Sequence, residues 1–79
     1  MTGHSEMIWL ERHDDDLNMH RFYALELTRD LFGQYLLTRR WGRVGRGAGQ
    51  FRVAAFDSKS MAEEVAEKLR LAKQKRGYA

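Results

Sequence analysis

Residues 19–41 read MHRFYALELTRDLFGQYLLTRRW, two strand-like stretches on either side of a turn. In an extended chain, alternate side chains share a face. Residues 19–29 then bring together Tyr23, Leu25 and Leu27, and residues 34–41 bring together Tyr35, Leu37, Arg39 and Trp41. Between them DLFG supplies Gly33, which tolerates the positive φ of a tight turn. Strands joined by a short turn pair antiparallel, so this segment predicts a hairpin.

Two more strand-like segments and a helix complete the expected fold. Residues 7–13 precede the hairpin, and residues 50–56 follow it. After Asp57 or Ser58, either of which can cap a helix, the apolar period changes to 3.6 residues. The stripe, from which Leu71 is absent, contains Met61, Ala62, Val65, Ala66, Leu69 and Ala72. The sequence predicts an α+β domain: an antiparallel meander of about four strands with one C-terminal amphipathic helix packed across it.

The bulk composition is typical of one small intracellular domain. At 79 residues the chain has room for a single core, which we expect over about residues 8–78 of a domain spanning 1–79. Cysteine is absent, which fits a reducing compartment. The N-terminal MTGHSE has no secretory signal pattern, and no apolar run reaches the ~20 residues of a membrane span. We therefore expect a cytoplasmic protein without a membrane partner.

Positive charge is concentrated in the middle of the chain. Residues 1–30 carry seven acids against three arginines, whereas residues 31–56 carry no acid and five arginines. These are Arg39, Arg40, Arg43, Arg46 and Arg52. The segment contains arginine and no lysine, and arginine is the residue preferred for bidentate phosphate recognition. A cluster of one sign predicts a polyanionic partner better than the net charge of +3 does.

The stretch RRWGRVGRGAGQ, residues 39–50, holds most of these arginines and admits three interpretations. A phosphate-binding loop is disfavoured, because the stretch leads into a strand and lacks the Lys-Ser/Thr pair that opens a helix. A second interpretation is structural: Trp41 ends a core strand and the arginines keep the turn soluble. In the third, the indole stacks on a base or sugar while the arginines hold the backbone. The pattern leaves the last two open.

Metal chemistry and catalysis are not indicated by the sequence. His4, His13 and His20 lack helical ligand spacing, and the acidic run 14–16 lacks the alternation and closing Glu of a calcium loop. No candidate nucleophile has a plausible base and oxyanion donor; the serines considered are Ser5, Ser58 and Ser60. We expect no metal, no cofactor and no enzymatic activity.

Three segments together resemble the WGR domain, a family named for its Trp-Gly-Arg motif. They are Phe22–Leu27 (FYALEL), Trp41–Gly47 (WGRVGRG) and Lys75–Tyr78 (KRGY), and the resemblance runs from about Ile8 to Tyr78. It implies a compact antiparallel sheet with one helix. In poly(ADP-ribose) polymerases the domain grips a DNA break and relays its presence to the catalytic domain. It also occurs in bacterial proteins, sometimes almost alone.

By that resemblance Trp41 would pack against a sugar or base at a DNA end, and Arg43 would reach both nucleic acid and a protein neighbour. Polymerase members often carry an asparagine where this chain has His20, with Asn18 nearby. The expected partner is a nucleic acid, DNA rather than RNA. The predicted binding residues are Arg21, Arg39, Arg40, Trp41, Gly42, Arg43 and Arg46. The alternative is a protein-interaction module that docks an acidic partner through Arg43 and the helix.

Overall fold

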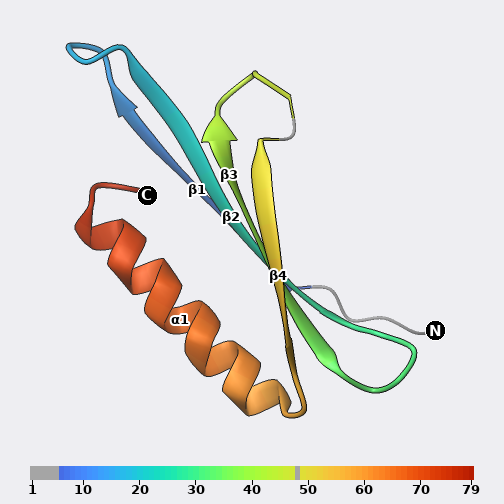
Figure 1. Ribbon diagram of the computed structural model, residues 1–79. Helices are drawn as coiled ribbons and strands as arrows, with labels where there is room; N and C mark the ends of the chain where they lie inside the picture. The colour runs from blue at the N-terminus through green and yellow to red at the C-terminus, as the bar shows by residue number, and fades with distance from the viewer. Residues whose placement is uncertain (1–5, 48) are drawn as a thin grey trace.

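The computed structural model describes residues 6–47 and 49–79, which form an open four-stranded sheet with a helix across one face (Figure 1). The elements are β1 (Glu6–Asp14), β2 (Met19–Arg29), β3 (Tyr35–Arg43), β4 (Gln50–Phe56) and α1 (Lys59–Lys75). The strands lie side by side in chain order, and each pairs antiparallel with the next. The predicted α+β meander with a C-terminal helix is confirmed.

The central hairpin forms as its turn residues predict. Gly33 has a φ of 85°, and the Asp30 carboxylate accepts hydrogen bonds from the backbone N–H groups of Phe32 (2.8 Å) and Gln34 (2.9 Å). The β1–β2 turn also uses a left-handed residue, Asn18, with a φ of 50°. One boundary differs from the prediction: β3 continues past Trp41 to Arg43, so the Trp-Gly-Arg motif belongs to a strand.

The strand register sorts the side chains between two faces of the sheet. Tyr23 in β2 lies opposite Leu10 in β1 and Trp41 in β3, so these three side chains share a face. This face packs against α1, and we call it the helix face. The residues between them in sequence, such as Phe22 and Gly42, belong to the other side, which no other element of the described chain covers. We call that side the open face.

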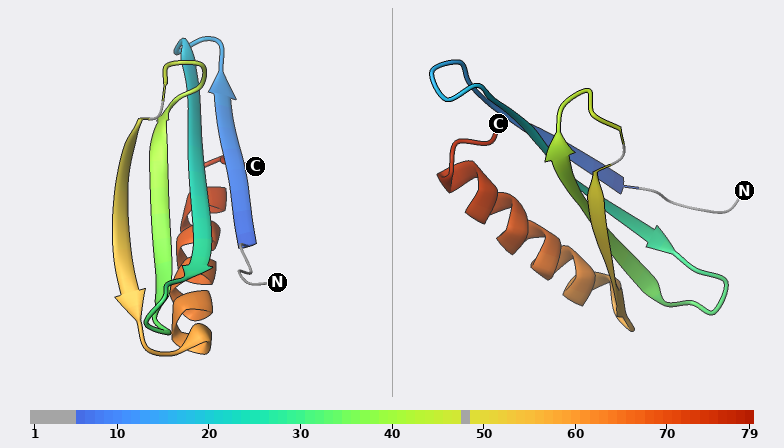
Figure 2. Two further views of the ribbon diagram at one scale, coloured as in Figure 1. Left: turned by 90° about the vertical axis from the view of Figure 1, so that its right-hand side faces the viewer. Right: turned by 45° about the horizontal axis from the view of Figure 1, so that its top comes forward.

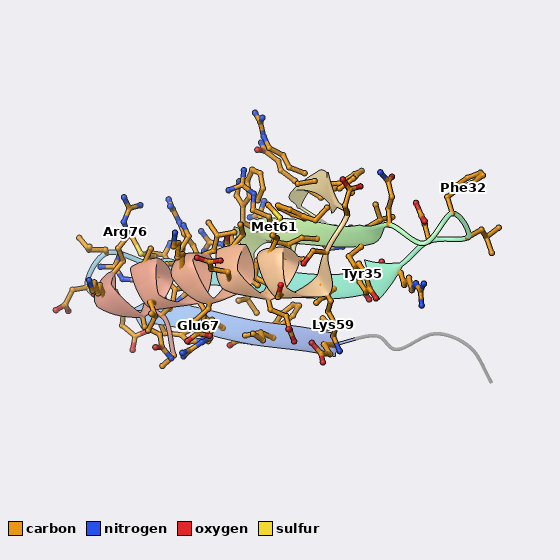
Figure 3. All side chains as sticks on the ribbon, turned by 90° about the horizontal axis from the view of Figure 1, so that it is seen from below. Phe32, Tyr35, Lys59, Met61, Glu67 and Arg76 are labelled. Carbon is orange, nitrogen blue, oxygen red and sulfur yellow. The ribbon has the colours of Figure 1, made fainter. Side chains whose placement is uncertain are left out.

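The core lies between the helix face and α1. Its buried residues are Leu10, Tyr23, Leu25, Leu37 and Tyr78, and half-buried apolar side chains around them include Ile8, Trp41, Phe56, Val65, Ala66 and Leu69. Two members of the predicted apolar stripe, Met61 and Ala72, are instead exposed; Met61 is labelled in Figure 3. They lie about 100° and 80° around the helix from the fully buried Ala62, both in the same direction, at one border of its packed side.

The helix ends are fixed by local hydrogen bonds. Ser58 is the N-cap, and its hydroxyl accepts a hydrogen bond from the Met61 N–H at 3.3 Å. At the other end Gly77, with a φ of 95°, reverses the chain, and the Tyr78 N–H donates to the Lys73 carbonyl at 3.1 Å. This Schellman turn returns Tyr78 to the core. Ala79 then pairs with Glu11 of β1 through two backbone hydrogen bonds of 2.9 and 3.0 Å.

Candidate nucleic-acid interface

The Trp-Gly-Arg motif is distributed over both faces of β3. Trp41 and Arg43 have the parity of the core residue Leu37 and lie on the helix face, whereas Gly42 lies on the open face. The loop after β3 contains Gly45, Gly47 and Gly49, all with positive φ, and the exposed Arg46. Trp41 therefore lies before this loop, within β3. A strand holds it, and strand alternation determines which neighbours share its face.

Trp41 is half-buried against the core. Trp41 pairs with Tyr23 on the neighbouring strand β2. The Arg39 guanidinium carbon lies 5.9 Å from the centroid of the indole ring. The two interpretations left open by the sequence are thus compatible in this geometry. One part of the indole contributes to the core, and the rest reaches solvent beside a cation.

A row of three arginines crosses the helix face next to Trp41. Arg12 in β1 pairs with Arg21 in β2, which pairs with Arg43 in β3. The adjacent row contains Leu10, Tyr23, Trp41 and Gln50, and the one after it contains Ile8, Leu25, Arg39 and Arg52. No Asp or Glu occurs in these three rows. Like charges directly opposite each other in a sheet are destabilising, so this arrangement stores unfavourable energy that an anionic ligand would relieve.

The last turns of α1 bring further cations to the same end of the molecule, where Figure 3 shows Arg76. The Lys73 ammonium lies over two aromatic rings, 4.7 Å from the centroid of Tyr23 and 5.2 Å from that of Tyr78. Burial lowers the pKa of Lys73, and the positive charges of Arg76, Arg39 and Arg21 lower it further. The lysine therefore lies in the combined field of arginines from β2, β3 and the end of the helix.

These residues form one surface, which we call the cationic face. It comprises Arg12, Arg21, Arg39, Arg43, Lys73 and Arg76, with Trp41 among them. Gly77 contributes by its lack of a side chain, because a Cβ there would lie 3.3 Å from Arg12 Nε. Tyr23 adds a buried hydroxyl without a hydrogen-bond partner in the described part of the chain. Sequence reasoning missed Arg12, Lys73 and Arg76, which only the strand register and the helix position bring here.

Two residues predicted for the site lie on the opposite side of the sheet. Arg40 is on the open face, where its guanidinium carbon lies 5.2 Å from the ring centroid of Phe51. Gly42 is required by packing: a Cβ there would come within 3.1 Å of both the Gly49 Cα and the Phe22 ring. Of the seven predicted residues, the structure brings together Arg21, Arg39, Trp41 and Arg43.

The histidines form a polar contact on the open face. His13 Nδ1 lies 2.8 Å from His20 Nδ1, and His13 Nε2 lies 2.7 Å from the Glu11 carboxylate. The Trp9 indole N–H donates to the same carboxylate, and these two hydrogen bonds lower the pKa of Glu11. Within residues 6–47 and 49–79, no group of three or more potential ligands could hold a metal ion. His4 and Ser5 lie outside the described residues.

An antiparallel sheet of four strands with one covering helix defines a small α+β domain, and one face of it carries the cationic cluster around Trp41. The chain belongs to the WGR domain family, whose family model matches residues 6–79. In poly(ADP-ribose) polymerase-like proteins the WGR domain is generally a nucleic-acid-binding module. No solved structure matches the chain significantly.

One curated relative is similar over nearly the whole chain. It is the uncharacterized protein y4dW of Sinorhizobium fredii (strain NBRC 101917 / NGR234), 39% identical over 78 residues. The match covers 99% of this chain and 38% of that protein, so this chain spans less than half of the relative's length. In the part of the chain that the structure describes, no helix is both long and apolar enough to cross a membrane.

Proposed function

We propose that this chain is a nucleic-acid-binding module, without catalytic activity of its own, that holds a phosphate backbone against the cationic face. The observation that carries the proposal is the row Arg12–Arg21–Arg43, in which three like charges lie side by side on neighbouring strands. Repulsion within such a row destabilises the free protein. Phosphates that lie across the row relieve this repulsion and add favourable interaction energy. Lys73 and Arg76 extend the same field from the end of α1.

We further propose that the preferred ligand is DNA and that Trp41 contacts a terminal sugar or base at an end or a break. Its indole is half-buried, so one part is fixed by the core and the exposed part is available to a terminal sugar or base. Arg39 and Arg43 flank it on the same face of the same strand. Stacking on an aromatic ring requires an unstacked base or an end, whereas the arginines alone would hold any backbone.

The test is a titration of labelled duplexes with blunt, nicked and overhanging ends at several salt concentrations. Contact with three or four phosphates predicts a log–log salt slope of about −3 to −4 and a Kd of roughly 10⁻⁴–10⁻⁶ M at physiological salt. Preference for ends over a closed circular duplex supports the role of Trp41.

A charge-matched control comes from the same strand. Arg43→Ala should reduce the salt slope by about one unit, because it removes one phosphate contact. Arg40→Ala removes the same charge from the open face and should leave the slope unchanged. Equal effects of the two substitutions would contradict the assignment of the cationic face. Absence of DNA binding at low salt would instead favour the acidic protein partner.

A further inference from the structure

The outer edge of β4 is a strand edge without a partner in the described chain. The strand order is β1-β2-β3-β4, and β4 pairs only with β3. The left view of Figure 2 shows β4 at one edge of the sheet, with α1 behind the strands toward the other edge. Every residue of β4 except Phe56 is exposed. The N–H and C=O groups along this edge can therefore accept another strand.

The two edges of the sheet differ in how they are protected. β1 carries charged side chains along its length, and Ala79 occupies part of its outer edge by pairing with Glu11. β4 reads QFRVAAF, with Arg52 as its one charged residue and no proline. Natural proteins protect free edges with charges, prolines, bulges or covering segments. β4 has almost none of these, which indicates that its edge is paired in the working protein.

The sequence of β4 is complementary to itself in one register. Two antiparallel copies must be related by a two-fold axis perpendicular to the sheet, so each residue pairs with one of its own face. An axis through Val53 pairs all seven residues, placing Phe51 opposite Ala55 and Arg52 opposite Ala54. An axis through Arg52 would set arginine against arginine and leave the end of the strand unpaired. The register centred on Val53 therefore avoids like-charge contacts and uses the whole strand.

We propose that the chain forms a two-fold homodimer by antiparallel pairing of β4 with β4, centred on Val53. Val53, which is 52% exposed, then faces its counterpart across the axis, and Phe51, which is 58% exposed, faces Ala55 of the second copy. Because the axis is perpendicular to the sheet, both helices lie on one side of the resulting eight-stranded sheet. The two cationic faces are consequently on that same side, where one nucleic acid can contact both.

A second copy fits this edge better than a nucleic acid does. β4 carries a single cation, and the open face beside it combines Arg40 with the carboxylates of Glu11 and Glu26. A nucleic-acid surface requires a concentration of positive charge, which the cationic face has and this edge lacks.

Sedimentation velocity of the protein without nucleic acid tests the proposal across micromolar to submillimolar concentrations. Val53→Lys sets two ammonium groups opposite each other on the axis and should convert the dimer to monomer. Met7→Lys is the matched control, because Met7 is 57% exposed on the same face and in the same row, but on the β1 edge. It should leave the dimer intact. Circular dichroism of both variants checks that each stays folded.

Site-specific cross-linking gives an independent readout, because the chain contains no cysteine. Cysteines at directly opposed strand positions lie within disulfide range, so Val53→Cys should yield a covalent dimer under mild oxidation. Met7→Cys should not. A wild-type protein that remains monomeric at all concentrations would overturn the proposal. So would a dimer that survives Val53→Lys, or one that Met7→Lys disrupts and Val53→Lys does not.

Discussion

Arg21 and Arg43 lie directly opposite each other on β2 and β3, on the same face of the sheet. A position between two strands that serves only stability would pair opposite charges or apolar groups there. The like-charged pair is unfavourable in the free protein and supports the proposed binding of a polyanion at this end of the sheet. The repulsion between Arg21 and Arg43 lowers the free energy of unfolding of the free protein, and this effect can be tested without knowing the ligand.

Arg21→Gln should make the free protein more stable. Removing one of two opposed cations should raise the free energy of unfolding by roughly 0.2–1 kcal/mol, the range for cross-strand pairs. Because screening already weakens the repulsion at high salt, the gain should shrink as salt is added. Urea denaturation at low and high ionic strength measures both quantities. A loss of stability at low salt would show that Arg21 has a favourable structural role, in contradiction to the prediction.

Trp41 can be tested with a substitution that separates packing from stacking. Trp41→Leu keeps an apolar side chain against Tyr23 and the core but removes the ring face. We expect it to weaken binding to DNA ends by on the order of 1–3 kcal/mol, the cost of one lost stacking contact. The salt slope should stay the same, because no charge is removed.

Stability measured on the same variants completes that test. Trp41→Ala leaves a cavity beside the core and should cost up to roughly 3 kcal/mol, near the lower end for deleted large side chains because the indole is only half-buried. A folded Trp41→Leu protein that binds every DNA form as tightly as the wild type would exclude the stacking role.

The fold could be predicted because its signals are local. Gly33 and the alternation on either side of it specify the β2–β3 hairpin, and Ser58 specifies the helix start. The composition of the site could not be predicted in the same way. Arg12 joins it through the register of β1 on β2, a pairing between residues far apart in sequence.

Two differences between the predicted site and the cationic face have simpler origins. Arg40 was included because it adjoins Trp41 in sequence, although strand alternation places neighbours on opposite faces. Lys73 was left out because the sequence alone does not place the end of the helix relative to the arginines of the sheet. It follows Ala62 by eleven residues, which is about 20° around the helix, so it lies at the centre of the packed side.

Leu69 and Leu71 test which side of α1 carries the packing. Leu69 packs against the core, whereas Leu71 is 45% exposed and lies about 180° around the helix from Ala62. Leu69→Ala should lower the free energy of unfolding by about 2 kcal/mol, the low end for leucine, because the side chain is half-buried. Leu71→Ala should change it by less than about 0.5 kcal/mol. Chemical denaturation of both variants measures the difference, and equal losses would contradict the packing of α1.

The lowered pKa of Lys73 predicts how the stability of the domain depends on pH. Its pKa lies below the ordinary 10.5, first because of burial and then because of Arg76, Arg39 and Arg21. Between the folded and ordinary pKa the unfolded chain binds more protons, so stability should rise with pH across that window. Lys73→Gln should remove this rise. Thermal unfolding from neutral pH upward measures it in both proteins.

A bound phosphate backbone should reverse the shift of Lys73. An anion on the cationic face favours the charged ammonium, so duplex DNA should raise the pKa of Lys73 toward its ordinary value or above it. The measurement is an NMR titration of the lysine ¹³Cε resonances with and without duplex, with the Lys73 signal assigned by its loss in Lys73→Arg. The Lys68 resonance serves as the reference, because its side chain points to solvent beside Glu64. If duplex DNA binds and the pKa of Lys73 does not rise, the phosphates lie elsewhere and the helix end is not part of the interface.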